Sequence, residues 1–273
     1  MTKLAIKAGS ERILVQDPPR AWRDTGKGRA ALAGLLAEIG PGSVMDGDPV
    51  AADGLGAPVP PDAKIIVMGG RAPLKETGGP EAGACIAGHA KFPSALADPG
   101  QPLRLPEGGG AFDADGVLGL VIGRRTGRIG AVDAAASVVG YTLLLDVTDR
   151  ARAEAEAETN NGLMAKNRRG LSPMGPCIWI PEAAPDPEEI VVTLRLNGEL
   201  RQSFTLADMA FGGGEVIAAW SPSVLRPGDV LGFGAAIVDP GRATELETPV
   251  PIQPGDVIEL SAEAIGGLRA EVE

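Results

Sequence analysis

Short runs of apolar residues, separated by Gly, Pro and Asp, dominate the chain after its first sixty residues. Runs of this kind, rich in Val, Ile and Leu and bounded by turn residues, predict β-strands. Asn197 and Gly198 stand between two such runs and predict a tight hairpin, because both residues tolerate positive φ. We therefore expect a mainly β region, with strands at residues 64–68, 117–122, 138–145, 177–180, 190–196 and 199–205.

The beginning of the chain mixes strand-like and helix-like patterns. Residues 3–16 alternate enough to predict a strand, and residues 30–39 place apolar side chains at helical spacing. Residues 46–61 are rich in Gly, Pro, Ala and Asp, which is typical of a linker. We therefore predict two domains, a small α/β lead-in domain over residues 1–61 and a larger domain over residues 62–273.

Composition and charge narrow the class of protein. The formal net charge is -11 and no Lys/Arg stripe offsets it, which argues against binding to nucleic acid or an acidic membrane. No apolar stretch reaches the roughly 18 residues of a membrane span, and charged residues interrupt the amino terminus, unlike a signal peptide. We therefore expect a cytoplasmic protein. Cys85 and Cys177 lack the spacing of metal ligands and are expected to be small core residues.

Acidic residues flank two of the predicted strands. Asp113 and Asp115 come just before the run at residues 117–122, and Asp146 follows the run at residues 138–145. Lys166 lies further along, in a segment with Gly and Asn. Side chains at strand ends can converge on one site, but turn acids and a surface lysine would give the same pattern. The residues by themselves leave both interpretations open.

Eight segments in the same order make the chain resemble the fumarylacetoacetate hydrolase family. They include KFPSALADPG, DADGVLGLVIG, GYTLLLDVTDR and KNRRGLSPMGP, and they lie at residues 64–69, 91–100, 113–123, 140–150, 166–176, 197–202, 225–230 and 255–259. The resemblance covers about residues 62–273, and the preceding part resembles the family's variable lead-in domain. It implies an α+β protein with a mixed, rolled β-sheet domain, commonly a homodimer.

The resemblance also implies the chemistry of a site. Family members hold Mg²⁺ or Mn²⁺ against the oxygens of a 2-oxo or 2,4-dioxo acid, a small-molecule substrate that they hydrolyse, decarboxylate, isomerise or dehydrate. The family's Glu-x-Glu falls on Asp115 and Val117, and its later metal-binding Asp falls on Asp146. Because Val117 offers no ligand, we expect a Mg²⁺ or Mn²⁺ site at Asp115 and Asp146 to be weakened or lost. Lys166 matches the family's active-site lysine, which supplies fixed positive charge.

Other positions of the family pattern also differ. The histidine that orients the attacking water aligns near Leu74, so that general base is absent. His89, the only histidine of the chain, could form a substitute catalytic dyad with Glu76 or Glu81, although a lone histidine is more often structural.

The loop that holds the substrate carboxylate in the family is changed as well. Its Thr-Gly-Thr-Pro sequence appears at residues 233–236 as Phe-Gly-Ala-Ala, which removes a hydroxyl contact. We therefore predict that the substrate either lacks that carboxylate or binds it through basic side chains. The predicted substrate-binding residues are Arg150, Arg168, Phe233 and Ala235, with Lys166 close by.

Three functions follow from this pattern. The first is a hydrolase or lyase that acts on a 2-oxo or 2,4-dioxo acid or related carbonyl compound by stabilising its enolate, with metal at Asp115 and Asp146. The second is a metal-independent isomerase, cyclase or dehydratase with a less charged substrate. The third is a non-catalytic scaffold whose pocket is filled by Val117, Met174 and Phe233.

Overall fold

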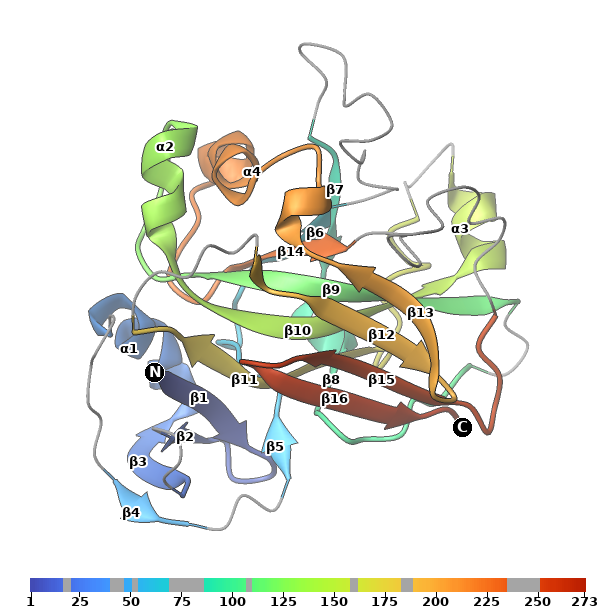
Figure 1. Cartoon of the computed structure of the whole chain (residues 1–273), viewed down its shortest axis with the longest axis horizontal. Helices are drawn as coiled ribbons and strands as arrows, with labels where there is room; N and C mark the ends of the chain where they lie inside the picture. The colour runs from blue at the N-terminus through green and yellow to red at the C-terminus, as the bar shows by residue number, and fades with distance from the viewer. Residues whose placement is uncertain are drawn as a thin grey trace.

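The computed structural model describes residues 1–16, 21–39, 47–50, 54–68, 86–106, 110–157, 162–182, 189–234 and 251–273. Within these residues most strands join one mixed sheet, in the order β4-β3-β2-β1-β11-β10-β9-β14-β6-β7, with β5 beside β1 and β8 beside β11 (Figure 1). Its strands are β1 (Thr2–Lys7), β2 (Arg12–Gln16), β3 (Arg23–Gly28), β4 (Asp48–Pro49), β5 (Leu55–Gly56), β6 (Ile65–Met68), β7 (Gly88–Lys91), β8 (Leu96–Ala97), β9 (Phe112–Ile122), β10 (Val138–Asp149), β11 (Ser172–Ile180) and β14 (Val230–Gly234).

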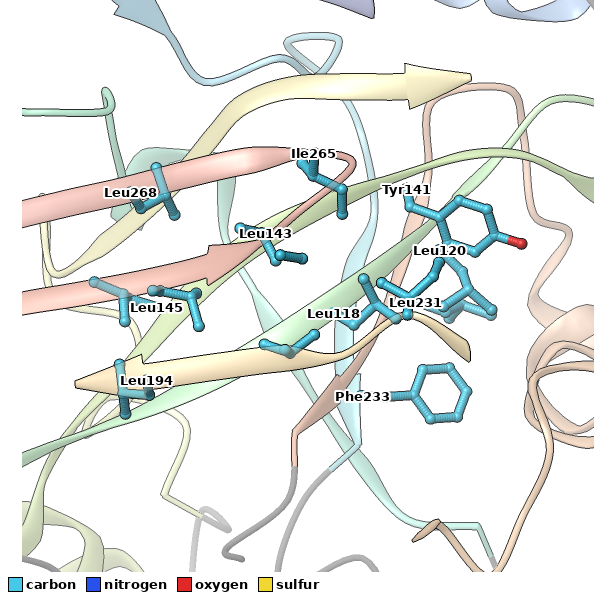
Figure 2. Packing of buried hydrophobic residues seen from close by; sticks show 14 of the residues in the cluster. Leu118, Leu120, Tyr141, Leu143, Leu145, Leu194, Leu231, Phe233, Ile265 and Leu268 are labelled. Carbon is cyan, nitrogen blue, oxygen red and sulfur yellow. The ribbon is translucent and has the colours of Figure 1, made fainter. Parts of the chain in front are cut away.

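A second, smaller sheet packs on the ladder of β9 and β10. Its order is β13-β12-β15-β16, and the strands are β12 (Val192–Leu196), β13 (Glu199–Phe204), β15 (Val257–Ala262) and β16 (Gly266–Glu271). Figure 1 shows this sheet in front of β9 and β10. Leu118, Leu143 and Leu145 of the large sheet meet Leu194 and Leu268 of the small sheet in the hydrophobic core (Figure 2).

The helices are short. They are α1 (Leu32–Glu38), α2 (Ala131–Ala134), α3 (Arg150–Glu156) and α4 (Gly213–Trp220). Helices α1 and α4 pack apolar side chains against the sheets. Helix α1 buries Leu32, Leu35 and Leu36, which is the apolar spacing that predicted it. Helix α3 begins at Arg150 because the side chain of Asp149 caps it by accepting a hydrogen bond from the amide of Arg152.

The α+β class and the mixed sheet predicted from the sequence are confirmed, and so is the hairpin. Asn197 and Gly198 have φ values of 53° and 81° and join β12 to β13. The prediction of one strand over residues 3–16 was wrong: β1 and β2 form a hairpin there, whose turn places Gly9 at φ 76°. A single apolar pattern spans both strands because both are buried in the same sheet.

Strands from both sides of residue 62 belong to the large sheet, since β1 pairs with β11 and β5 pairs with β1. The division at residue 62 stays a prediction, as does the homodimer. In the segment predicted as a linker, Ala57 and Val59 are buried. Cys177 is a buried free thiol, as expected, whereas Cys85 lies outside the described residues.

Candidate functional site

The acidic residues lie inside the two longest strands rather than just beyond their ends. Strand β9 already begins at Phe112 and β10 continues to Asp149, so both strands are longer than the apolar runs that predicted them. In the antiparallel register Asp115 faces Asp146, and Asp113 faces Thr148. The ladder therefore brings together acids that stand about thirty residues apart in the sequence.

Asp146 is the centre of a buried cluster of charges. Its side chain is only 4 % exposed, and its Oδ1 lies 2.6 Å from the Nζ of Lys91. Its Oδ2 accepts a hydrogen bond of 2.8 Å from the Nζ of Lys166 and lies 3.2 Å from the Nε2 of His89. Two lysines and a histidine therefore surround one carboxylate.

Strand β7 contributes two of these side chains from the far edge of the sheet. His89 and Lys91 stand two residues apart and therefore project from the same face of the strand. Three strands, β9, β14 and β6, lie between β7 and β10 in the strand order of the sheet. The contacts of both side chains with Asp146 therefore require the sheet to curl until its β7 edge approaches β10, which agrees with the rolled sheet that was predicted.

The cluster fixes the charge state of its members. Burial by itself would raise the pKa of Asp146, but the charges of Lys91 and Lys166 and the contact with His89 hold that pKa well below its usual value. Burial lowers the pKa of His89, against the opposing effect of Asp146, so the imidazole is neutral at pH 7. Burial also lowers the pKa of Lys91, and Asp146 opposes this shift.

Lys166 differs from Lys91 because it reaches the surface. The side chain of Lys91 is 0 % exposed and that of Lys166 is 19 % exposed. The Nζ of Lys166 donates hydrogen bonds of 2.8 Å to Asp146 and 2.8 Å to the hydroxyl of Thr148. An ammonium group has three protons to donate, so these two contacts leave one for another acceptor.

Asp115 is held by a different partner. Gln202 of β13 donates from Nε2 to Oδ1 of Asp115 at 2.9 Å, while its Oε1 accepts a 2.6 Å hydrogen bond from the amide of Gly116. Burial raises the pKa of Asp115 to about 6, and the nearby charges of Asp113 and Asp146 add to this shift. A partly exposed carboxyl with such a pKa can exchange protons near neutral pH.

The two arginines predicted to bind substrate pair with acids of the same ladder. Arg150 holds Asp113 through two nitrogens, and Arg168 lies 2.9 Å from Asp149. Burial raises the pKa of Asp113, and the guanidinium of Arg150 opposes that shift. The side chains of Arg150 and Arg168 are 45 % and 38 % exposed. Contact of either arginine with a substrate stays a prediction.

The charges of the described residues do not suit a divalent cation at Asp115 and Asp146. Both oxygens of Asp146 already meet ammonium groups, and Val117 is buried and apolar where the family pattern has a glutamate. No cluster of three or more His, Cys, Asp or Glu is arranged for metal binding in the part of the chain that the structure describes. Carboxylates and cations balance around the site, which contains Asp113, Asp115 and Asp146 together with Lys91, Arg150 and Lys166.

The remaining predicted residues are placed as follows. Phe233 is 2 % exposed and packs beside Leu231 in the hydrophobic core (Figure 2), so a role in binding substrate stays a prediction. Glu76, the second catalytic candidate beside His89, lies outside the described residues. Leu74, Glu81 and Ala235 lie outside them too.

Three further polar residues of the site, Lys91, Asn167 and Gln202, are not among those predicted from the sequence. Asn167 is buried and donates from Nδ2 to the carbonyls of Ala90 and Leu163, and its Oδ1 accepts from the amide of Phe92. Lys91, Asn167 and Gln202 each stand in segments that carried the family resemblance. A polar residue inside such a segment was the available signal for all three.

The fold and the polar site together define an α+β protein whose long central strands carry buried acids, and Lys91 of β7 and Lys166 of the turn before β11 pair with one of them, Asp146. Residues 72–273 match the family model described as "Fumarylacetoacetate (FAA) hydrolase C-terminal". Since this match covers most of the chain, the protein belongs to the fumarylacetoacetate hydrolase family. The fold of this family is typical of enzymes.

Solved structures of this family resemble the chain over its whole length. A fumarylacetoacetate hydrolase from Exiguobacterium antarcticum is 27 % identical with a TM-score of 0.80, covering 100 % of this chain and 99 % of that one. A probable 2-hydroxyhepta-2,4-diene-1,7-dioate isomerase from Mycobacterium abscessus is 25 % identical with a TM-score of 0.79, covering 100 % and 98 %. Maleylpyruvate hydrolase from Sphingobium, in complex with manganese and pyruvate, is 23 % identical with a TM-score of 0.73, covering 99 % and 98 %, and shares the fold.

Curated relatives match a smaller part of the chain than the solved structures do. An uncharacterized protein of Staphylococcus aureus (strain USA300) is 33 % identical over 162 residues, which are 59 % of this chain and 52 % of the relative. The chain therefore spans about half the length of the curated relatives it matches. Among the described residues, no helix has the length and apolar character needed to span a membrane.

Proposed function

We propose that the protein is an enzyme that acts on a 2-oxo or 2,4-dioxo acid or a related carbonyl compound. It removes a proton from the carbon beside the keto group, stabilises the enolate that results, and returns a proton to it, as an isomerase does. The observation that carries this proposal is the position of Lys166. Its ammonium group is fixed by Asp146 and Thr148, reaches the surface, and keeps one proton to donate.

Lys166 supplies the charge that an enolate needs. When a proton leaves the carbon beside a keto group, negative charge develops on the keto oxygen. An ammonium group that is already held in place stabilises this oxygen without reorganisation. Asp146 holds the ammonium group in position, and Lys91 neutralises the second oxygen of Asp146.

Asp115 is the proposed carrier of the proton. A general base works best when its pKa lies near the working pH, and the pKa of Asp115 is raised to about 6. The contact with Gln202 orients its carboxyl group from the second sheet. Asp115 faces Asp146 across the ladder, so the proton carrier lies on the strand next to the residue that holds the ammonium group of Lys166.

Isomerisation fits these residues better than hydrolysis. Hydrolysis needs a base that positions a water molecule, and the family position for that histidine aligns near Leu74 in this sequence. The similar structures include both a hydrolase and an isomerase, and both of their names denote substrates with carboxylate groups. The balanced charges around Asp146 support chemistry that does not pass through a divalent ion.

Proton exchange with solvent tests this function. The purified protein is incubated in D₂O with EDTA and a panel of 2-oxo and 2,4-dioxo acids, and NMR follows the hydrogens on the carbon beside the keto group. We expect exchange that is faster than in buffer with at least one acid. Absence of exchange with every acid, or exchange that appears only when Mn²⁺ is added, would contradict the proposal.

A second candidate is the non-catalytic scaffold, and one observation favours it. Val117, Met174 and Phe233, the side chains expected to fill the pocket in that case, are 1 %, 0 % and 2 % exposed. The scaffold would neither exchange protons in any of the acids nor be stabilised by oxalate, a mimic of the enolate. A rise in the melting temperature with oxalate would therefore exclude it.

A further inference from the structure

Glu156 is a buried acid at an unfavourable place in its helix. It is the last residue of α3, where the negative end of the helix dipole repels a carboxylate, and only 5 % of the residue is exposed. Burying an ionised carboxylate costs free energy unless hydrogen bonds and charges compensate it. The neighbouring Glu154, in contrast, is exposed on the same helix. The position of Glu156 therefore calls for specific partners.

These partners are the backbone of the turn that precedes Lys166. One carboxylate oxygen of Glu156 accepts hydrogen bonds from the amides of Met164 at 3.0 Å and Ala165 at 3.3 Å. The other oxygen accepts from the guanidinium of Arg152, one helical turn earlier. Burial by itself would raise the pKa of Glu156, but these hydrogen bonds hold that pKa below its usual value. The carboxylate is thus ionised and fully engaged.

The same turn is anchored at other points. The carbonyl of Ala165 accepts a 3.1 Å hydrogen bond from the amide of Asp149, and the carbonyl of Lys166 accepts from the ammonium of Lys91. Asn167 reaches back to the carbonyl of Leu163 at 2.8 Å. Among these anchors, Glu156 alone holds two consecutive amides directly before Lys166.

We infer that Glu156 is a positioning residue for Lys166. Its carboxylate fixes the backbone at Met164 and Ala165, so that the Lys166 side chain emerges toward Asp146 and Thr148 with its remaining proton free for the substrate oxygen. Glu156 acts through the turn and does not contact the substrate. This inference rests on the proposed function, because it gives Lys166 the role described there.

The test compares Glu156→Ala, Glu156→Gln and the matched control Glu154→Gln. Hydrogen exchange of the backbone measures the amides of residues 163–166 directly and does not depend on activity. We expect these amides to lose protection in Glu156→Ala and to keep most of it in Glu156→Gln, whose amide oxygen still accepts. Glu154→Gln should match the wild type. Unchanged protection in Glu156→Ala would overturn the inference.

The second part of the test is kinetic. It measures proton exchange on the 2-oxo acid whose protons the wild type exchanges fastest. A misplaced catalytic group lowers kcat strongly, so we expect a loss of about tenfold or more in Glu156→Ala, with a much smaller change in KM and partial rescue in Glu156→Gln. An unchanged kcat in a variant whose turn has loosened would overturn the inference. If Glu156→Ala does not fold, Glu156→Gln and Arg152→Ala carry the same comparison.

A failure of the proposed function is distinguishable from a failure of this inference. If the wild-type protein exchanges no protons in any acid, the proposed function fails, and positioning is then judged from the chemical acetylation of Lys166. Faster acetylation of Lys166 in Glu156→Ala than in Glu154→Gln would support the positioning role. Equal rates would overturn it.

Discussion

Asp115 and Asp146 face each other across the β9–β10 ladder, but cations neutralise only Asp146. Lys91 and Lys166 hold Asp146 ionised, with its pKa well below the usual value. Asp115 contacts the neutral amide of Gln202, and its pKa is raised to about 6. Two equivalent positions on neighbouring strands thus become a fixed charge and a titrating group, which is the division of roles that acid–base catalysis requires.

The raised pKa of Asp115 predicts a stability effect that depends on pH. Its pKa rises from 3.8 to about 6 on folding, so the ionised form is less stable in the folded protein, and stability falls as pH increases through this range. Asp115→Asn does not titrate and keeps an oxygen for Gln202. At pH 7.5 we expect the variant to be more stable than the wild type by about 1 kcal/mol, after discounting for partial exposure.

Urea unfolding at pH 7.5 and near pH 4 measures this effect. The advantage of Asp115→Asn should shrink toward zero at the lower pH, where the wild-type carboxyl is protonated in the folded state. An advantage of equal size at both pH values would show that titration of Asp115 is not its cause.

Removal of Lys91 should be costly. Lys91→Met leaves the buried Oδ1 of Asp146 without its cation, and we expect a loss of about 3 kcal/mol in the free energy of unfolding. Adding Asp146→Asn removes the uncompensated charge, so the double variant should lose less than the sum of the two single variants. Strictly additive losses would argue that Lys91 and Asp146 do not depend on each other.

Divalent metals should have little effect on the wild-type protein. Because three cations balance the carboxylates around Asp146, we expect the melting temperatures in EDTA and in about 1 mM Mn²⁺ to agree. Lys166→Met frees an oxygen of Asp146 and leaves a net negative charge, so this variant should show a larger shift with Mn²⁺ than the wild type. A shift of several degrees in the wild type would contradict the charge balance.

Two glycines, one in the central ladder and one in α1, should respond in opposite ways to an added methyl group. A Cβ on Gly140 of β10 would lie 2.5 Å from the carbonyl oxygen of Trp179. This oxygen belongs to the backbone of β11 and cannot move away easily. We expect Gly140→Ala to destabilise the protein by about 2 kcal/mol or more. Gly34 in α1 has open space around it, so Gly34→Ala should stabilise the protein by about 0.5–1 kcal/mol. Thermal unfolding distinguishes these opposite signs.

The sequence predicted the elements of this fold better than their limits. Apolar runs located β9 and β10, but β9 starts before its run begins at Val117 and β10 continues after its run ends at Leu145, in both cases through acidic residues. Hydrophobicity marks the part of a strand that faces the core, and it cannot mark strand residues whose partners are charged groups. The hairpin at Asn197 and Gly198 was predictable because positive φ is a local requirement.

The site was predictable only in part. The family resemblance placed Asp115, Asp146 and Lys166 together, but the partners of Asp146 also come from β7, which three strands separate from β10. The role of Lys91 depends on the curl of the sheet, a long-range property that no local pattern records. The position of Glu156 depends equally on a turn formed after its own helix.

Exchange of substrate protons with solvent, measured in Lys166 variants, tests whether the ammonium group of Lys166 stabilises the enolate. In D₂O with EDTA, NMR compares the wild type with Lys166→Met and with Arg169→Met, which removes an exposed cation nearby, using an acid whose protons the wild type exchanges. We expect Lys166→Met to lose at least about a hundredfold in exchange rate, as for a lost electrostatic donor, while Arg169→Met stays close to the wild type. Equal exchange rates in the wild type and a folded Lys166→Met would contradict this role of Lys166.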